Sequence, residues 1–243
     1  MTHQKSRVAL AVSTIAFAIF FNIPFSILGA TFEYPDILRR PAGEILTKFH
    51  AGGSSLILTW HAFAIAALLF VPVSVALSLR PGRVSRYPAL SIGAAITGSL
   101  AGLAQAIGLW RWVFVVPTLA RDYVSADASE ATKLAAVNTF NLINLYGGVA
   151  IGEHIGQLLT TLFVVMLSIV QWREGNRITA VIGLVSGAGI AVGTNEGLAI
   201  ALGSSGEVFG TVTVVGFLGL TAWLIATGIT ILRASKTDAQ GAA

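Results

Sequence analysis

Residues 54–79 read SSLILTWHAFAIAALLFVPVSVALSL, and this stretch decides the fold. It holds 26 residues without a lysine, arginine, aspartate or glutamate. At about 1.5 Å per residue, a helix of this length exceeds the ~30 Å hydrocarbon core of a bilayer. Five further apolar runs have a similar length. The sequence therefore predicts an all-α, polytopic membrane protein, with one domain over residues 1–243 and six transmembrane helices at about 8–30, 54–79, 88–119, 147–171, 178–203 and 208–232.

The composition leads to the same class. Hydrophobic residues make up 55% of the chain, charged residues 11%, and the mean hydropathy is +0.80. A water-soluble chain of 243 residues could not bury that much apolar surface. The absence of cysteine excludes disulfides, thiolate metal sites and cysteine nucleophiles. The formal charge of +4 does not indicate nucleic acid binding, because the basic residues flank apolar runs, and we expect membrane lipids as partners instead.

The basic residues also predict the orientation in the membrane. The first apolar run has about 23 residues and no small-residue cleavage site, so it is interpreted as a retained helix rather than a secretion signal. Inner segments are richer in lysine and arginine than outer ones, which predicts that both termini are cytoplasmic. With that orientation the inner set is Lys5, Arg7, Arg80, Arg83, Arg86, Arg173, Arg177, Arg233 and Lys236, and the outer set is Arg39, Arg40, Lys48, Arg121 and Lys133.

Two outer connections are longer than a tight turn between helices requires. Residues 121–146 carry three candidate N-caps, Ser125, Asp127 and Ser129, before a helix-like pattern. Both connectors are predicted to be amphipathic, and they either cover an outward-facing cavity or rest on lipid headgroups. In residues 32–53 the apolar positions that predict a short interfacial helix are Ile37, Leu38, Ile45, Leu46 and Phe49.

Polar residues inside the apolar runs share one depth, about 10 Å from the outer side. An ionisable group in hydrocarbon costs about 2.5–3.5 kcal/mol unless it finds a partner or water. Four helices bring such groups to this layer, which predicts an outward-facing polar pocket among helices two to five. Its candidate residues are His61, Arg111, Glu153, His154, Gln157, Asn195 and Glu196, and Trp60, Trp110 and Trp112 are candidate wall residues or interface anchors.

Each candidate also has a structural interpretation. Arg111 could neutralise Glu153 or Glu196 in an ion pair between helices, and Glu196 could serve only as such a partner. His61 could be a neutral packing residue. The glycine-rich faces allow a homo-oligomer. They predict close helix packing rather than phosphate binding at Gly183, Gly187, Gly189 and Gly193.

Two segments resemble a known family. Residues 108–117, GLWRWVFVVP, and residues 152–156, GEHIG, are similar to a bacterial family of small six-helix membrane proteins, the domain-of-unknown-function family 4386. The resemblance spans nearly the whole chain. It implies the six-helix architecture, a bacterial cytoplasmic (inner) membrane location and site roles for Arg111, Glu153 and His154, and it implies no reaction.

Three function classes remain open. In the first, the pocket binds a small amphiphilic or lipid-soluble molecule, in an accessory protein or a membrane enzyme that uses Glu153 and His154 for proton transfer. In the second, His61 and His154 ligate a b-type haem, with Arg111 near a propionate. In the third, the polar layer is the binding site of a transporter or exporter of small molecules.

Overall fold

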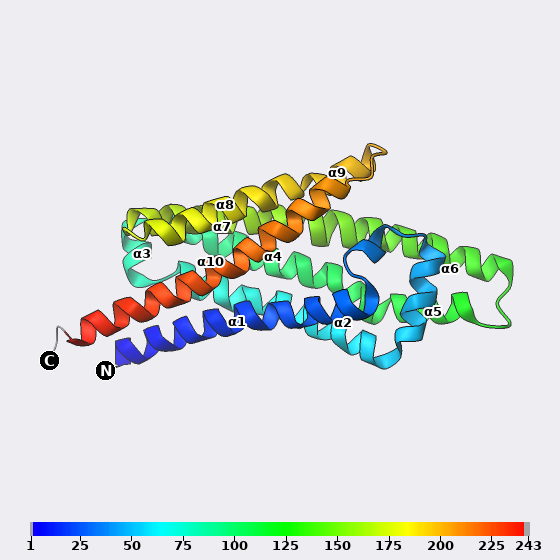
Figure 1. The fold of residues 1–243 in the computed structure, drawn as a ribbon, viewed down its shortest axis with the longest axis horizontal. Coiled ribbons are helices and arrows are strands. Elements are labelled where there is room, and N and C mark those ends of the chain that lie inside the picture. The colour runs from blue at the N-terminus through cyan, green and yellow to red at the C-terminus, as the bar shows by residue number, and fades with distance from the viewer. Residues whose placement is uncertain (1, 241–243) are drawn as a thin grey trace. The chain divides into compact units, whose positions relative to one another are not determined.

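A computed structural model describes residues 2–240, with side chains from Gln4 to Ser235. Between these limits the chain consists of helices joined by short non-helical connections and contains no strand (Figure 1). Its elements are α1 (Thr2–Phe32), η1 (Asp36–Arg39), α2 (Ala42–Ser78), α3 (Pro81–Arg86), α4 (Pro88–Phe114), α5 (Val116–Val124), α6 (Glu130–Ile143), η2 (Asn144–Ile155), α7 (Gly156–Arg173), α8 (Arg177–Gly193), α9 (Asn195–Ala201) and α10 (Glu207–Gln240).

Within residues 2–240, six helical segments are long and apolar enough to cross a membrane, which confirms the predicted all-α membrane fold. The chain is therefore a multi-pass membrane protein. The segments are Gln4–Phe32, Ala42–Ser78, Pro88–Val124, Glu130–Arg173, Arg177–Ala201 and Glu207–Ser235.

The chain packs as two compact units. Unit 1 comprises Met1–Phe20, Leu69–Leu103 and His154–Ala243. Unit 2 comprises Phe21–Leu68 and Ala104–Glu153. The divisions between them fall inside α1, α2, α4 and η2, so each of these helices contributes residues to both units.

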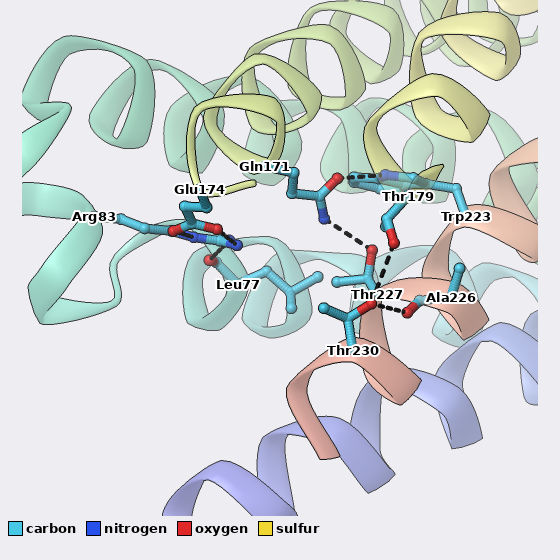
Figure 2. A network of polar contacts seen from close by, with 9 residues as sticks. All are labelled: Leu77, Arg83, Gln171, Glu174, Thr179, Trp223, Ala226, Thr227 and Thr230. Carbon is cyan, nitrogen blue, oxygen red and sulfur yellow. Dashed lines mark hydrogen bonds and ion pairs between the residues drawn. The ribbon is translucent and has the colours of Figure 1, made fainter. Parts of the chain in front are cut away.

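Unit 1 is held together by small residues and buried hydrogen bonds. A Cβ added at Gly189 would lie 3.2 Å from the Cα of Gly216, and Ser186 donates a hydrogen bond to the Gly216 carbonyl. α8 and α10 therefore meet almost backbone to backbone, as the glycine pattern predicted. Further along, Gln171 accepts a hydrogen bond from the Trp223 indole and donates one to Thr227 (Figure 2).

The core of unit 2 is aromatic. Trp60 and Trp112 stack in parallel, with ring centroids 4.7 Å apart and 9° between their planes. Phe32 meets both rings edge-on, and Phe49 stacks on Trp112. All four side chains are almost completely buried. These contacts come from α1, α2 and α4 and fix the positions of the three helices inside unit 2.

The first connector is largely helical, and its apolar side faces the protein. It contains η1 and the first turns of α2, which end at the non-helical Gly53 (φ 56°, ψ −152°). A positive φ of this kind favours glycine. The apolar side of this connector packs into the core of unit 2 instead of lipid headgroups. The buried residues are the predicted ones, Ile37, Leu38, Ile45, Leu46 and Phe49.

The second connector continues into the fourth span. α6 begins after Ser129, whose hydroxyl accepts a hydrogen bond from the Thr132 amide (3.1 Å), so this predicted cap is confirmed. The helix then passes through the π-helical η2 into α7, and no separate start occurs near residue 147. Two other predicted runs are interrupted, one at Val115 and one at Thr194.

Candidate functional site

Arg111 is a buried cation with neutral partners. Its side chain comes from the last turn of α4 and is 7% exposed. Nη1 donates a hydrogen bond to the Gly108 carbonyl, and Nη2 donates one to Oδ1 of Asn144 (3.0 Å). The guanidinium also lies over the Trp112 ring, 5.1 Å from its centroid. The charge is thus oriented by two neutral oxygens and an aromatic face.

Glycines make room for this arginine. A Cβ added at Gly148 would lie 2.5 Å from Nη2 and 2.6 Å from Cζ of Arg111. One added at Gly108 would lie 2.7 Å from the Cα of Gly152, so α4 and η2 approach at backbone distance. A π-helical turn is widened relative to an α-helix and often marks a functional site. Gly148 therefore lets η2 pack on Arg111 without ending the helix.

Among the described residues, several buried side-chain nitrogens of unit 2 have no hydrogen-bond partner. The indole N–H groups of Trp60 and Trp112 have no hydrogen-bond partner, although both side chains are fully buried. Nε of Arg111, the indole N–H of Trp110 and Nδ1 of His61 are also without a partner. Each unsatisfied buried polar group costs about 1–3 kcal/mol, and native proteins contain few of them. Unit 2 thus holds four buried N–H donors without an acceptor, from Trp60, Trp110, Arg111 and Trp112.

Glu153 pairs with Arg39, a residue of the first connector. Nη2 of Arg39 donates a hydrogen bond to its carboxylate at 2.8 Å, and the two side chains are 28% and 22% exposed. The alternative in which Arg111 forms an ion pair with Glu153 is not what the described residues show, because Arg111 bonds to Gly108 and Asn144 and Glu153 bonds to Arg39. Arg39, the last residue of η1, supplies the cation instead. The buried side chains of Ile37 and Leu38 anchor η1 in the core of unit 2.

The first connector also carries a network of ion pairs. Glu33, which has a positive φ of 58°, accepts hydrogen bonds from Arg40 and Lys48, and Arg40 also bonds to Glu44 at 2.7 Å. The hydrogen bond from Lys48 holds the pKa of the Glu33 carboxyl below its ordinary value, and the charges of Arg40 and Lys48 lower this pKa further. These ion pairs hold η1 and the start of α2 together.

The remaining candidates lie in unit 1. His154 places Nδ1 3.0 Å from the Thr194 carbonyl, at the interruption between α8 and α9. With Nδ1–H as donor, Nε2 keeps its lone pair. Gln157 is buried. Asn195 is exposed and donates to the carbonyls of Ala191 and Val192 in the preceding helix, α8. The Glu196 carboxylate lies within 3.3 Å of a Cβ added at Gly210.

A comparison with known families gives one match. Residues 10–228 match DUF4386, a domain of unknown function. The chain belongs to this family. No curated protein and no solved structure matches it. The resemblance seen in the motifs around Arg111 and Glu153 is thereby confirmed, and the family assignment supplies no ligand or reaction.

In this DUF4386 protein the predicted residues divide between the two units. Unit 2 brings Arg111 together with Trp60 and Trp112, and it also contains His61, Trp110 and Glu153. Unit 1 contains the other four candidates, so a single polar layer stays a prediction. The alternative of Trp60 and Trp112 as interface anchors is wrong, because both are completely buried.

Asn144 and Arg39 are site residues that sequence reasoning missed. Asn144 is buried and holds the Arg111 guanidinium, but it lies in a stretch that the sequence showed only as an amphipathic connector. Arg39 was counted as an outer basic residue. The charged residues inside the apolar runs are the signal for both residues, because buried charges require polar partners, and the connectors can supply them.

Proposed function

We propose that this DUF4386 protein binds a small amphiphilic molecule in unit 2, where Arg111, Trp60 and Trp112 donate hydrogen bonds to an acceptor headgroup. The observation that carries this proposal is the group of buried donors without acceptors. Among the described residues, Trp60 Nε1, Trp112 Nε1 and Arg111 Nε all lack a partner. An acceptor-bearing ligand would satisfy them, and its apolar part would suit the aromatic surroundings.

An anionic headgroup fits better than a neutral one. Arg111 makes its two hydrogen bonds to uncharged oxygens, and the nearby Glu153 carboxylate is already bonded to Arg39. A buried charge without a counterion is costly, and a carboxylate or phosphate would offset that cost. We therefore expect a ligand with one anionic group and an apolar chain or ring.

A catalytic version of this function would use Glu153 and His154. The Glu153 carboxylate, which accepts a hydrogen bond from Arg39, is the first candidate base. The Nε2 lone pair of His154 is a second candidate base. The location proposed for this activity is the bacterial cytoplasmic membrane, with both termini cytoplasmic and the ligand entering from the outer side.

Tryptophan quenching by a brominated lipid tests the proposal. The probe is 9,10-dibromostearate, titrated into the detergent-purified protein, with its methyl ester as the neutral comparison. We expect the carboxylate to quench at lower concentration than the ester, and Arg111→Gln to remove that preference. Arg121→Gln, which changes an exposed arginine, is the matched control. Equal quenching of the wild type and Arg111→Gln by the carboxylate would refute an anionic site at Arg111.

Transport is the second candidate, and interrupted helices favour it. Val115 separates α4 from α5, Thr194 separates α8 from α9, and η2 is π-helical. Interrupted spans expose backbone groups that transporters use to hold substrates and ions. Proteoliposomes loaded with a labelled anionic amphiphile distinguish the two functions, because a binding protein or enzyme would not move the label across the bilayer.

The haem alternative fits the residues only in part. A histidine that ligates a metal normally donates a hydrogen bond from the N–H of its other ring nitrogen to an oxygen acceptor. His154 makes such a hydrogen bond from Nδ1 to the Thr194 carbonyl. His61 does not, because its Nδ1 is buried without a partner. A visible absorption spectrum before and after dithionite tests this alternative, with His61→Ala and His154→Ala beside the wild type. A Soret band that both variants lose would establish haem, and a colourless protein would remove this class.

A further inference from the structure

Asn144 is an unusual partner for a buried cation. Nη2 of Arg111 donates a hydrogen bond to its Oδ1 at 3.0 Å, and both side chains are less than one-tenth exposed. A buried cation is normally paired with a carboxylate, because an isolated charge is costly away from water. Arginine carries only donors, so the amide must turn its oxygen toward the guanidinium. Asn144 therefore orients the Arg111 charge without neutralising it.

The other contacts of Arg111 are also uncharged. Nη1 donates to the Gly108 carbonyl, and the guanidinium lies over the Trp112 ring. Within the part of the chain that the structure describes, Arg111 forms no ion pair. The charge of Glu153 does act on Arg111, but Glu153 is bonded to Arg39, whose positive charge acts in the opposite sense. No carboxylate is therefore in direct contact with the guanidinium.

Helix η2 fixes both the amide and the space beside it. Asn144 is the first residue of η2, and its backbone N–H donates to the carbonyl of Phe140, whose ring meets Trp112 edge-on with centroids 5.8 Å apart. About one turn later, Gly148 leaves room for the guanidinium, because a Cβ there would lie 2.5 Å from Nη2 of Arg111. The groups that η2 presents to Nη2 are therefore an uncharged oxygen and a glycine.

A carboxylate at the same place would have the opposite electrostatic effect. Asn144→Asp has nearly the same shape, so its carboxylate would accept a charge-assisted hydrogen bond from Nη2. The protein would then supply its own counterion to Arg111, and a second anion beside that carboxylate would be repelled. With the neutral amide, the counterion can come from a ligand. Nε of Arg111, which is buried without a partner, is a donor that such a ligand can use.

We propose that Asn144 is the specificity-determining residue of the site in unit 2, because its neutral amide leaves the Arg111 charge available to the anionic headgroup of the ligand. This inference rests on the function proposed above. It adds that the carboxylate or phosphate of the ligand is the counterion of Arg111. A neutral amphiphile of the same shape binds more weakly, because it leaves the buried charge uncompensated.

Titrations with a charged and a neutral probe distinguish this role from a structural one. 9,10-Dibromostearate and its methyl ester are titrated separately into the detergent-purified wild type and Asn144→Asp, and the Tm of each ligand-free protein is measured. Asn144→Asp should raise the half-quenching concentration of the carboxylate by about tenfold or more and leave that of the ester nearly unchanged. Its ligand-free Tm should be equal to or above that of the wild type, because the new carboxylate is paired with Arg111.

Two further variants are controls. Asn141→Asp introduces the same negative charge at an exposed position three residues earlier, so it should keep the preference for the carboxylate and rules out long-range repulsion. Asn144→Ser keeps an uncharged acceptor on a shorter side chain. It should bind both probes more weakly than the wild type and still prefer the carboxylate.

Failure of this inference and failure of the proposed function give different results. A wild type that binds carboxylate and ester equally refutes the proposed function, and this inference with it. If the wild type prefers the carboxylate and Asn144→Asp keeps that preference, only the role of Asn144 is refuted. A ligand-free Tm of Asn144→Asp well below that of Asn141→Asp would contradict pairing of the new carboxylate with Arg111. If Asn144→Asp does not yield folded protein, Asn144→Ser decides, because loss of its preference would show that the amide acts through its shape and not its neutrality.

Discussion

Replacement of Gly108 by alanine should destabilise the contact between α4 and η2. The added methyl would lie 2.7 Å from the Cα of Gly152 and 3.0 Å from the Gly147 carbonyl, both of them backbone atoms. Ordinary contact begins at 3.4 Å, so the two backbones must separate by about 0.7 Å. Overpacking of this kind costs about 1–3 kcal/mol. Arg111 would move as well, because it donates to the Gly108 carbonyl.

Thermal unfolding in detergent measures this effect. At about 2–4 °C per kcal/mol for a chain of this size, a cost of about 2 kcal/mol lowers Tm by about 4–8 °C. Gly82→Ala is the matched control, because a Cβ at Gly82 meets nothing within 4 Å, and its Tm should be unchanged or slightly raised. If Gly108→Ala melts with the wild type and Gly82→Ala, the close packing of α4 on η2 described for unit 2 is refuted.

Three other perturbations separate the roles of neighbouring groups. Gly148→Ala should weaken dibromostearate quenching severalfold with a smaller loss of Tm than Gly108→Ala, because the added methyl meets the guanidinium of Arg111, and an unchanged titration would contradict this placement. Glu174→Gln should cost about 3 kcal/mol of stability, because it leaves the buried Arg83 without its ion-pair partner. Glu130→Gln should leave Tm unchanged, because the Glu130 side chain is 92% exposed. Similar melting of both variants would argue against a stabilising ion pair between Arg83 and Glu174. The pKa of Glu33 lies below its ordinary value of 4.5 in the folded protein, so the stabilisation by its ion pairs is present at neutral pH and is lost as the pH falls through the folded pKa. Over this range the Tm of Glu33→Gln should therefore fall less than that of the wild type. Parallel curves of Tm against pH for the two proteins would exclude this contribution.

The membrane-spanning helices could be predicted because hydropathy sums over about 20 residues and tolerates local errors. The interruptions could not be predicted as securely. Val115 precedes Pro117, which lacks an amide hydrogen and disfavours continuation of α4, so a signal was present there. Thr194 lies between Gly193 and Asn195, and neither residue requires a helix to stop inside a membrane.

The site residues were predictable one by one, and their partners were not. Arg111 and Glu153 stand out because charges are rare in apolar runs. Their pairing depends on tertiary packing, since Asn144 and Arg39 reach them from η2 and from the first connector. The burial of Ile37 and Leu38 brings Arg39 to Glu153, and an amphipathic pattern cannot show whether it faces lipid or protein.

Indole nitrogen NMR tests the central claim most directly. The protein has five tryptophans, and each gives one indole N–H signal after ¹⁵N labelling. Single Trp→Phe variants assign the signals of Trp60 and Trp112, and Trp223, which already donates to Gln171, serves as the internal reference. If an anionic amphiphile satisfies the buried donors, stearate added to the delipidated protein shifts the Trp60 and Trp112 signals to hydrogen-bonded positions while that of Trp223 stays in place. Unchanged Trp60 and Trp112 signals at saturating stearate would contradict the proposed site.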